Sequence, residues 1–372
     1  MSGAVHAEAV YAERLARVRA EMSARNVDAL IVSVGRDLPY LVGYEAMPLE
    51  RLTLLVVPRE GEATMLIPRL EAPRVADMPS VFTLKPWNET DDPVALAHDL
   101  LGAAGTVAVG DQMWSRFLVE LLGHRPRGSW VRSQVVMEAL RSRKDAAEIA
   151  ALAAAAAAAD RVAAQLQAGD IALVGRTEAQ VSADISARLI AEGHDKVNFA
   201  IVAAGENAAS PHHHAGERVI GEGEIVLCDF GGTKDGYCSD ITRCVHLGEP
   251  PRDIVEAYEA LHEAQAAGVA AGKVGVPCQD VDTAARSVLD AAGYGEWFVH
   301  RTGHGIGMEE HEDPYMVQGN DTLIEAGHAY SVEPGIYIPG RWGMRLEDIV
   351  VATDDGPRAL NTADHSLVVL GV

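Results

Sequence analysis

The hydrophobic and polar positions of roughly the first 135 residues alternate between a helical period and short apolar runs. Helical periodicity with mixed charge over about 7–25 predicts an opening helix. The apolar runs predict strands, and later helical periodicity predicts two more helices. This alternation is typical of a small α/β domain with helices on both faces of one sheet. The predicted strands cover 29–34, 53–57, 64–67, 81–84 and 107–110, and the two later helices cover 93–101 and 114–122.

The pattern changes after a charged segment at 141–145. An alanine-rich helix follows, because alanine has the highest helix propensity, and short strands then alternate with further helices. The last 80 residues are rich in strand and turn signals such as Glu-Pro-Gly and Asp-Asp-Gly. We therefore expect a second, α+β domain, with domains at 1–140 and 141–372. The predicted helices of the second domain cover 146–168, 178–192, 252–271 and 279–292.

Composition narrows the range of partners. A chain of 372 residues has room for two cores. A net charge of −23 argues against nucleic acid or an anionic membrane as a partner, since both require a basic surface. The simplest role of this charge is solubility. The chain has no Gly-x-Gly-x-x-Gly turn, so nothing supports dinucleotide binding.

The four cysteines form no Cys-x-x-Cys pair, and we expect buried free thiols in a reducing cytosol. The first residues lack the basic and apolar segments of a signal peptide. No uncharged apolar stretch reaches the roughly 20 residues that a membrane span requires. These features predict a cytoplasmic protein.

Five residues in the last 144 positions carry the candidate chemistry, and each stands in a strand or turn context. A lone aspartate at a strand end is usually a turn former, but turn formation does not explain all five residues together. Four carboxylates and one imidazole are a hard, oxygen-rich ligand set that suits manganese, and less exclusively cobalt or zinc. Two bridged ions would balance four carboxylates and could clamp an attacking water and a substrate oxygen. The five residues are Asp229, Asp240, His304, Glu333 and Glu347.

The order and flanking residues of this set resemble the pita-bread metallopeptidases, which include methionine aminopeptidase, aminopeptidase P, prolidase and the metal-free creatinase. The Gly-His-Gly turn at His304, the Glu-Pro-Gly turn at Glu333 and the Arg-Leu-Glu-Asp segment at Glu347 match the prolidase and aminopeptidase P branch. The resemblance implies an α+β pita-bread catalytic domain preceded by a smaller α/β, creatinase-like N-terminal domain. It also implies a homodimer.

Carried over residue by residue, the resemblance assigns a role to each ligand. Asp229 would bind one metal ion in bidentate fashion. His304 and Glu333 would complete the set of the other ion, and Asp240 and Glu347 would bridge the two.

The resemblance also implies residues that bind substrate. His212 and His311 match the branch's two histidines outside the metal set, and His213 is a neighbouring competitor for His212. Arg345 matches an arginine near the substrate pocket; the alternative is that it pairs with a ligand carboxylate or with Asp37. Asp37 lies in an Arg-Asp-Leu-Pro-Tyr segment that resembles an N-terminal-domain segment near these active sites.

The chain departs from the branch at Tyr315. Some prolidases carry an arginine there, just after a His-Glu-x-Pro segment, where it can hold the substrate carboxylate. Tyr315 can donate one hydrogen bond but cannot form a bidentate charged pair. This leaves His212, His213 and Arg345 as candidates for the carboxylate end. We expect His300, which matches no motif, to be structural.

These residues predict a dinuclear-metal hydrolase that cleaves the bond before proline in a small peptide. The leading hypothesis is an Xaa-Pro dipeptidase (prolidase). Glu333 would move the proton of the attacking water, and His212 and His311 would donate to the carbonyl oxygen. One alternative is an aminopeptidase P that acts on longer peptides. Others are a hydrolase or lyase for a small non-peptide metabolite on the same scaffold, and a metal-free binding module, against which the intact ligand set argues.

Overall fold

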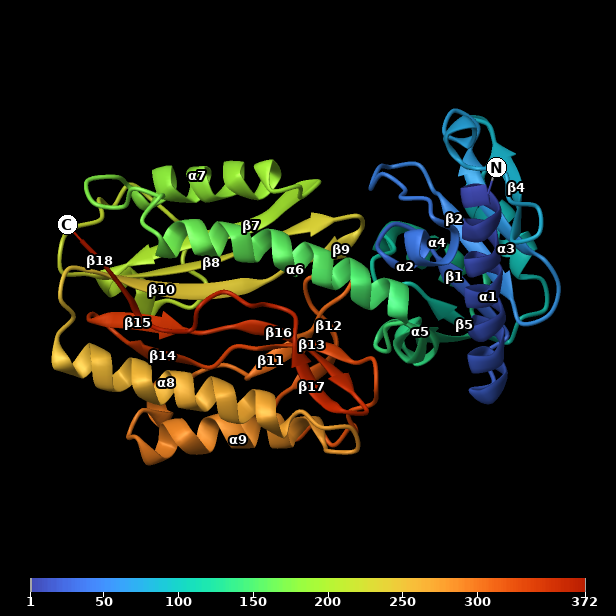
Figure 1. Ribbon diagram of the computed structural model, residues 1–372. Helices are drawn as coiled ribbons and strands as arrows, with labels where there is room; N and C mark the ends of the chain where they lie inside the picture. The colour runs from blue at the N-terminus through green and yellow to red at the C-terminus, as the bar shows by residue number, and fades with distance from the viewer. Residues whose placement is uncertain (1, 372) are drawn as a thin grey trace. The chain divides into compact units, whose positions relative to one another are not determined.

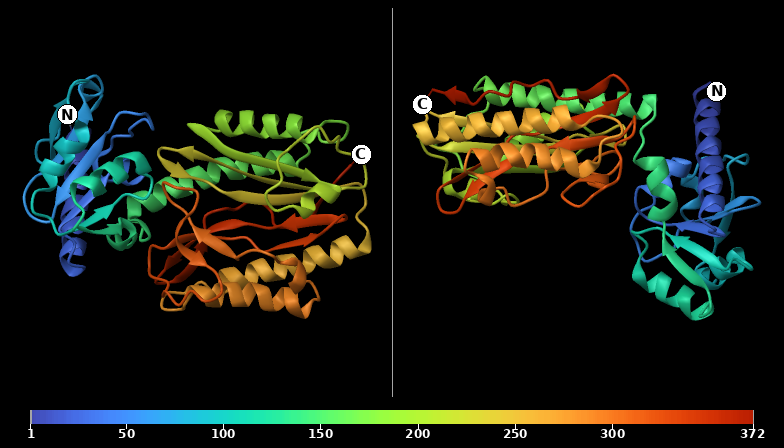
Figure 2. Two further views of the ribbon diagram at one scale, coloured as in Figure 1. Left: turned by 180° about the vertical axis from the view of Figure 1, so that it is seen from behind. Right: turned by 90° about the horizontal axis from the view of Figure 1, so that it is seen from below.

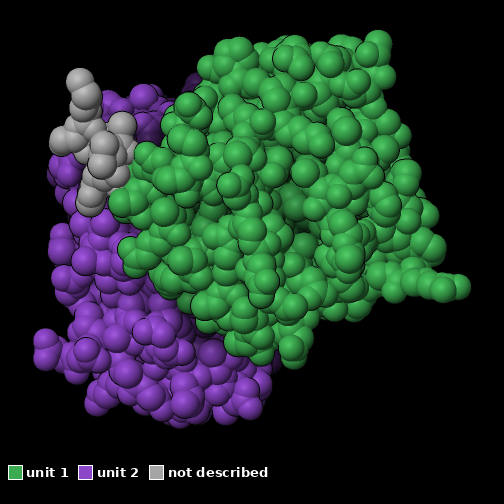
Figure 3. Space-filling view, turned by 90° about the vertical axis from the view of Figure 1, so that its right-hand side faces the viewer, with its two compact units in different colours: residues 1–141 green, residues 142–372 purple. Residues whose placement is uncertain are grey.

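The structure is a computed structural model that describes residues 2–371. The chain divides into two compact units, Met1–Arg141 and Ser142–Val372, which Figure 3 colours green and purple. The division falls in the charged segment at 141–145, one residue from the boundary that the sequence predicts.

The N-terminal unit is built on one mixed six-stranded sheet. Its strands are β1 (Ala29–Val32), β2 (Leu54–Pro58), β3 (Ala63–Pro68), β4 (Phe82–Trp87), β5 (Thr106–Val109) and β6 (Ser129–Arg132), and helices α3 (Pro93–Leu101) and α4 (Ser115–His124) pack beside it. The strand order is β4-β3-β2-β1-β5-β6, with β1 parallel to β5 and antiparallel to β2. Ile31 and Val109 pack in one core with α3 and α4, so these helices cover one face of the sheet.

The other face of this sheet is covered as well, because Leu30 and Ala108 point the opposite way along their strands and are fully buried. The remaining helices are α1 (Ser2–Ala24), α2 (Asp37–Val42) and α5 (Gln134–Arg141), with a 3-10 turn η1 (Ala72–Arg74). The guanidinium of Arg14 on α1 lies 4.0 Å from the ring centre of Tyr40 on α2, and Tyr40 Oη donates to the carbonyl of Leu140 on α5. These contacts tie the three helices together.

The C-terminal unit places its sheets between two pairs of helices (Figures 1 and 2). The helices are α6 (Ala146–Gln167), α7 (Glu178–Ala191), α8 (Arg252–Ala271) and α9 (Cys278–Ala291), with 3-10 turns η2 (Gly205–Ala209) and η3 (Gly295–Trp297). α6 and α7 lie on one side of the strands, and α8 and α9 lie on the other. α6 and α7 each begin with a capping box, at Asp145 with Glu148 and at Thr177 with Gln180, which satisfies free N–H groups of the first turn.

Two sheets and a hairpin form the layer between these helices. The strands are β7 (Lys196–Ala204), β8 (Ile225–Lys234), β9 (Tyr237–Cys238), β10 (Ile241–Leu247), β11 (Gly303–Gly305), β12 (Glu312–Met316), β13 (Ala329–Val332), β14 (Gly335–Ile338), β15 (Trp342–Arg345), β16 (Asp348–Thr353), β17 (Gly356–Ala359) and β18 (Val368–Leu370). One sheet has the order β18-β10-β8-β7 with β9 on β8, the other has the order β12-β11-β13-β16-β17, and β14 pairs with β15. Apolar cores fill the space on both sides of this layer.

Helix α6 has an unusually apolar sequence. In the part of the chain that the structure describes, it is the one helix long and apolar enough to cross a membrane by length and composition, and half of the tested window is buried inside the protein. Leu152 and Ala156 on α6 pack against the sheet strands, as in the core helix of a globular domain.

The predicted fold classes are confirmed. The helices predicted at 93–101 and 252–271 have the predicted limits. Three short elements were missed, namely α2, β6 and α5: α2 is only six residues long and has a proline inside it, and β6 has no fully buried residue to mark it as a strand. All four cysteines are free and buried, as predicted.

Candidate metal centre

The five predicted ligands converge because neighbouring strands carry them. Asp229 lies in the middle of β8, directly opposite Thr242 of β10, and Asp240 immediately precedes β10. His304 is the central residue of β11, and Glu333 follows β13. Glu347 lies between β15 and β16 and bridges to Thr242.

The glycines beside His304 allow this strand to fit between its neighbours. A Cβ atom at Gly303 would collide with the carbonyl oxygen of Ser331, and one at Gly305 would collide with that of Asp313. Only glycine leaves room for backbones this close. The Gly-His-Gly segment is therefore needed to place the imidazole between β12 and β13.

One cavity of about 590 Å³ has all five residues in its wall, and we call it the acidic cavity. Asp240, His304 and Glu347 offer ligand atoms that all lie within 4.8 Å of one another. His304 Nε2 also lies 3.1 Å from Glu333 Oε1. Asp229, the fifth candidate ligand, lies in the same wall.

The carboxylates of this cavity lack enough partners inside the protein. Asp229 Oδ1, Asp240 Oδ1 and Glu347 Oε1 are buried and have no hydrogen-bond partner within residues 2–371. Burial raises the pKa of Asp240 well above its usual value, and the charges of Glu347 and Asp229 add to the rise. Burial and neighbouring carboxylates raise the pKa of Glu347 in the same way. Buried oxygens with unsatisfied negative charge fit divalent cations, so the donor set matches the predicted group.

Glu333 is electrostatically different from the other three carboxylates. Burial alone would raise its pKa, but the hydrogen bond and charge of His304, with His300 and Arg345, outweigh burial and lower the pKa below its usual range. Ser331 Oγ also donates to Glu333 Oε1 at 2.9 Å. These contacts keep Glu333 ionised and fixed in orientation.

Arg345 contacts one candidate ligand directly and a second one through Thr242. Its Nη2 lies 2.5 Å from Asp229 Oδ2, and its Nε donates to Thr242 Oγ1 at 3.1 Å. Thr242 Oγ1 in turn donates to Glu347 Oε2 at 2.7 Å. Arg345 Nη1 donates to Tyr337 Oη at 2.7 Å. Of the alternatives that the sequence left open, this geometry favours pairing of Arg345 with a ligand carboxylate.

The structure separates the two competing histidines. His212 lies in the wall of the acidic cavity. His213 Nε2 instead lies 2.8 Å from Glu178 Oε2 at the start of α7, and His213 is not part of that wall. His311 lies in the wall, and its ring centre is 4.0 Å from that of His304. Burial, with the neighbouring His304 and Arg301, lowers the pKa of His311 to about 4.

Two other predicted substrate residues do not line the acidic cavity. Asp37 lies in the N-terminal unit, where Arg141 Nη1 donates to it at 2.8 Å and Ser133 Oγ donates at 3.2 Å. Tyr315 lies on β12 outside the cavity wall, and the guanidinium of Arg301 lies 4.3 Å from its ring centre. The predicted substrate roles of these residues stay predictions.

Sequence reasoning missed Arg301 and left His300 outside the site, although both line the acidic cavity. His300 has both ring nitrogens engaged, with Tyr337 Oη at 2.9 Å and the Arg301 carbonyl at 2.7 Å, which fits its predicted structural role. Arg301 stands three residues before His304, and a basic residue this near a candidate metal ligand was a signal available in the sequence.

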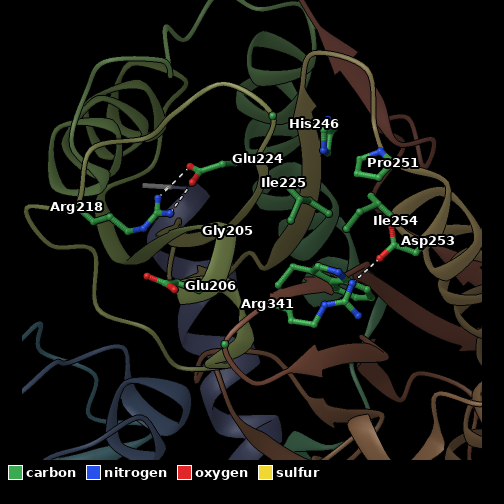
Figure 4. A pocket seen from close by; sticks show the side chains of 13 residues that line it. Gly205, Glu206, Arg218, Glu224, Ile225, His246, Pro251, Asp253, Ile254 and Arg341 are labelled. Atoms are coloured by element: carbon green, nitrogen blue, oxygen red, sulfur yellow. Dashed lines mark hydrogen bonds and ion pairs between the residues drawn. The ribbon is translucent and has the colours of Figure 1, made fainter.

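A second cavity of the C-terminal unit, of about 430 Å³, has a different character (Figure 4). Its two arginines each pair with an acid, and a third acid, Glu206, also lines it. Arg218 Nη1 donates to Glu224 Oε2 at 3.0 Å, and Arg341 Nη2 donates to Asp253 Oδ2 at 2.7 Å (Figure 4). Paired charges of this kind do not call for a cation, unlike the acidic cavity.

Comparison with known proteins agrees with this geometry. Residues 144–354 match the model of metallopeptidase family M24, and residues 14–143 match that of the creatinase/prolidase N-terminal domain. A probable dipeptidase PepE of Mycobacterium tuberculosis is 44% identical over 98% of this chain and 97% of its own length. The crystal structure of dipeptidase PepE from Mycobacterium ulcerans superposes with a TM-score of 0.93 at 45% identity, covering 98% of this chain and 99% of that one.

A more distant solved structure shares the same architecture. Recombinant prolidase from Thermococcus sibiricus superposes with a TM-score of 0.91 at 32% identity, covering 97% of this chain and 99% of that one. The pita-bread resemblance seen in the sequence is thereby confirmed. The protein is a metallopeptidase of family M24, with a creatinase/prolidase N-terminal domain ahead of its catalytic domain.

Proposed function

We propose that this protein is a metal-dependent Xaa-Pro dipeptidase. The observation that carries the proposal is the acidic cavity, which the five candidate ligands line and where three buried carboxylate oxygens lack partners among the described residues. Relatives named as a dipeptidase and a prolidase support the same reading.

The ligand set would hold two divalent ions. Asp229 would bind one ion, His304 and Glu333 the other, and Asp240 and Glu347 both. An oxygen-rich set with one imidazole favours Mn²⁺, with Co²⁺ and Zn²⁺ as alternatives. When bound, two such ions supply a hydroxide near neutral pH by lowering the pKa of a shared water.

The protein's own side chains would handle the protons and the developing charge. Glu333 faces the acidic cavity and would accept the proton of the attacking water. His212 and His311 lie in the same wall and would donate hydrogen bonds to the carbonyl oxygen as it gains negative charge. The proline nitrogen carries no hydrogen, so the leaving group must receive a proton, which Glu333 or His311 would supply.

Two further features belong to this proposal. Buried free cysteines and a net charge of −23 support a cytoplasmic enzyme that binds neither nucleic acid nor membrane. The family resemblance supports a homodimer. We propose a small peptide with proline in second position as the substrate.

Hydrolysis of Ala-Pro and Ala-Pro-Ala, side by side, tests the proposal on enzyme stripped with chelator and reloaded with Mn²⁺. Cleavage of Ala-Pro with little activity on the tripeptide is the expected result. Equal or faster cleavage of the tripeptide would favour the aminopeptidase P alternative. Hydrolysis that persists after chelation would contradict the proposed function. So would the absence of hydrolysis of both peptides with metal bound.

A further inference from the structure

The wall of the acidic cavity contains one arginine whose charge is not neutralised by a carboxylate. Arg301 lines the cavity, is partly exposed, and forms no ion pair with any residue that the structure describes. Its guanidinium carbon instead lies over the ring of Tyr315, 4.3 Å from the ring centre. We propose that Arg301, supported by the ring of Tyr315, binds the free carboxylate of the dipeptide substrate; this inference rests on the proposed function.

The other candidates for a carboxylate-binding cation are already engaged. Arg345 is held by Asp229, Thr242 and Tyr337. His213 bonds to Glu178 and does not line the cavity. Arg301 is therefore the one permanent positive charge in the described wall that is available to an incoming anion.

Strand pairing brings Arg301 and Tyr315 together. β11 and β12 are antiparallel neighbours, and Gly303 stands opposite Met316. The backbone N–H of Thr302 donates to the carbonyl of Met316 at 3.1 Å, which fixes the segment just before β11 against β12. Arg301 and Tyr315 are the residues next to this bond, and Arg301 Cζ lies over the Tyr315 ring.

Stacking suits a guanidinium that must bind a carboxylate. An arginine over an aromatic face keeps its charge, loses little freedom on binding, and leaves the N–H groups at its edge free. Those groups match the two oxygens of a carboxylate in a bidentate pair. Tyr315 stands where some prolidases carry an arginine, so the aromatic ring would support a cation from the adjacent segment in place of supplying one.

A cation is needed at this site for electrostatic reasons. Besides the four ligand carboxylates, Glu310 also lines the acidic cavity. A substrate carboxylate entering this wall meets repulsion from every acid that metal does not neutralise. Arg301 would offset that repulsion for peptides whose carboxylate lies next to the proline, and would thereby favour dipeptides.

Paired substrates that differ only in the terminal carboxylate test the inference. Wild type, Arg301→Met and Arg301→Lys would be assayed on Ala-Pro and on its C-terminal amide, with Arg341→Met as a control outside the acidic cavity. Arg301→Met should lower kcat/KM for Ala-Pro roughly 10- to 100-fold, mainly through KM, and change the amide less than about 3-fold. The kcat/KM of Arg301→Lys for Ala-Pro should lie between those of wild type and Arg301→Met. Lysine keeps the positive charge but lacks the planar guanidinium that pairs with both carboxylate oxygens.

The role of Tyr315 has its own matched pair of variants. Tyr315→Phe keeps the aromatic face and should keep the wild-type ratio of kcat/KM between Ala-Pro and its amide. Tyr315→Ala removes the aromatic face and should lower kcat/KM for Ala-Pro by a few-fold. The value for the amide should change little. Equal losses on acid and amide in Tyr315→Ala would show a purely structural role and contradict the proposed support.

A binding measurement makes the inference independent of turnover. An Ala-Pro analogue with a methylene in place of the scissile carbonyl would be titrated by calorimetry, as free acid and as amide, into the Mn²⁺-loaded proteins. Wild type should prefer the acid roughly 10-fold or more, and Arg301→Met should lose that preference. An unchanged preference in Arg301→Met would overturn the inference.

Failure of the inference and failure of the proposed function give different results. If wild type cleaves Ala-Pro and Arg301→Met keeps the acid-over-amide preference, Arg301 is excluded and the dipeptidase stands. If wild type cleaves Ala-Ala and not Ala-Pro, the proline specificity is wrong, and the same acid and amide comparison on Ala-Ala still tests Arg301. If wild type binds neither analogue and cleaves no dipeptide, both fail.

Discussion

The guanidinium of Arg345 lies 2.5 Å from Asp229, joining the end of β15 to the middle of β8. Both side chains are almost fully buried. The contact uses Asp229 Oδ2 and leaves Oδ1 without a protein partner in the described chain. Arg345 therefore orients a candidate metal ligand, and we infer that its main effect on activity passes through the metal site.

Replacement of Arg345 should weaken metal binding more than substrate binding. We expect Arg345→Met to lower Mn²⁺ affinity about 10- to 100-fold, because partners that orient metal ligands typically contribute that much. Arg345→Lys should lose less Mn²⁺ affinity, since lysine keeps a positive charge beside Asp229. Mn²⁺ titration by calorimetry measures the effect, and Arg341→Met is the control. A raised KM for Ala-Pro with unchanged Mn²⁺ affinity would point to direct substrate binding by Arg345.

Sequence could single out the candidate ligands because their backbone contexts are local. Asp229 follows an apolar strand segment, and His304 lies between glycines that only a tightly packed strand requires. Sequence could not decide between His212 and His213, because the choice depends on Glu178, which lies on α7 and binds one of them.

Arg301 shows a second limit of the sequence. Its neighbour Tyr315 is 14 positions away in the chain, and the pairing of β11 with β12 brings the two chain segments side by side. The main helices were predictable because each is at least nine residues long, about two and a half turns or more. The short helix α2 spans six residues and could not show a helical repeat.

Glu333 should be essential for turnover and less important for binding. Glu333→Gln keeps the size of the side chain but cannot accept a proton, so kcat for Ala-Pro should fall roughly 10²- to 10⁴-fold. Binding of the methylene analogue should remain measurable. The exposed Glu325 gives a matched control, and Glu325→Gln should keep wild-type kcat. Metal content must be measured on the same sample, because near-normal kcat with full metal occupancy would exclude Glu333 as the proton carrier.

Metal should stabilise the catalytic unit because it neutralises buried carboxylates. At a free Mn²⁺ concentration of about 100 times Kd, linkage gives about 2.7 kcal/mol of stabilisation. For a unit of this size that corresponds to a rise of about 5–10 °C in Tm. Scanning calorimetry with chelator and with Mn²⁺ measures the shift.

Glu347→Gln provides the matched variant for this prediction. It removes one of the buried negative charges, and a glutamine oxygen can still accept from Thr242. The chelated form of Glu347→Gln should therefore unfold at a higher temperature than chelated wild type, and Mn²⁺ should raise its Tm much less. An equal Mn²⁺ shift in both proteins would mean that metal stabilises the protein somewhere else.

Burial of His328 should make the protein less stable in mild acid. Burial lowers the pKa of His328 to about 4, and the charges of Lys144 and Arg143 add to the shift. His328 Nδ1 accepts from the backbone N–H of Glu325 at 3.3 Å, which requires the unprotonated nitrogen. The unfolded chain binds the proton below about pH 6.5 and the folded chain does not until about pH 4, so stability is complete above pH 6.5 and falls between those values.

His328→Gln should remove this part of the pH dependence. The pKa shift from 6.5 to about 4 sets an upper limit of about 3 kcal/mol on the loss. Urea unfolding at pH 7, 6 and 5 in chelator gives the difference in unfolding free energy between wild type and variant. That difference should move in favour of His328→Gln as the pH falls, because only wild type must keep a buried imidazole neutral. The exposed His262 supplies the control, His262→Gln, and a pH-independent difference for His328→Gln would show that protonation of His328 does not limit stability in acid.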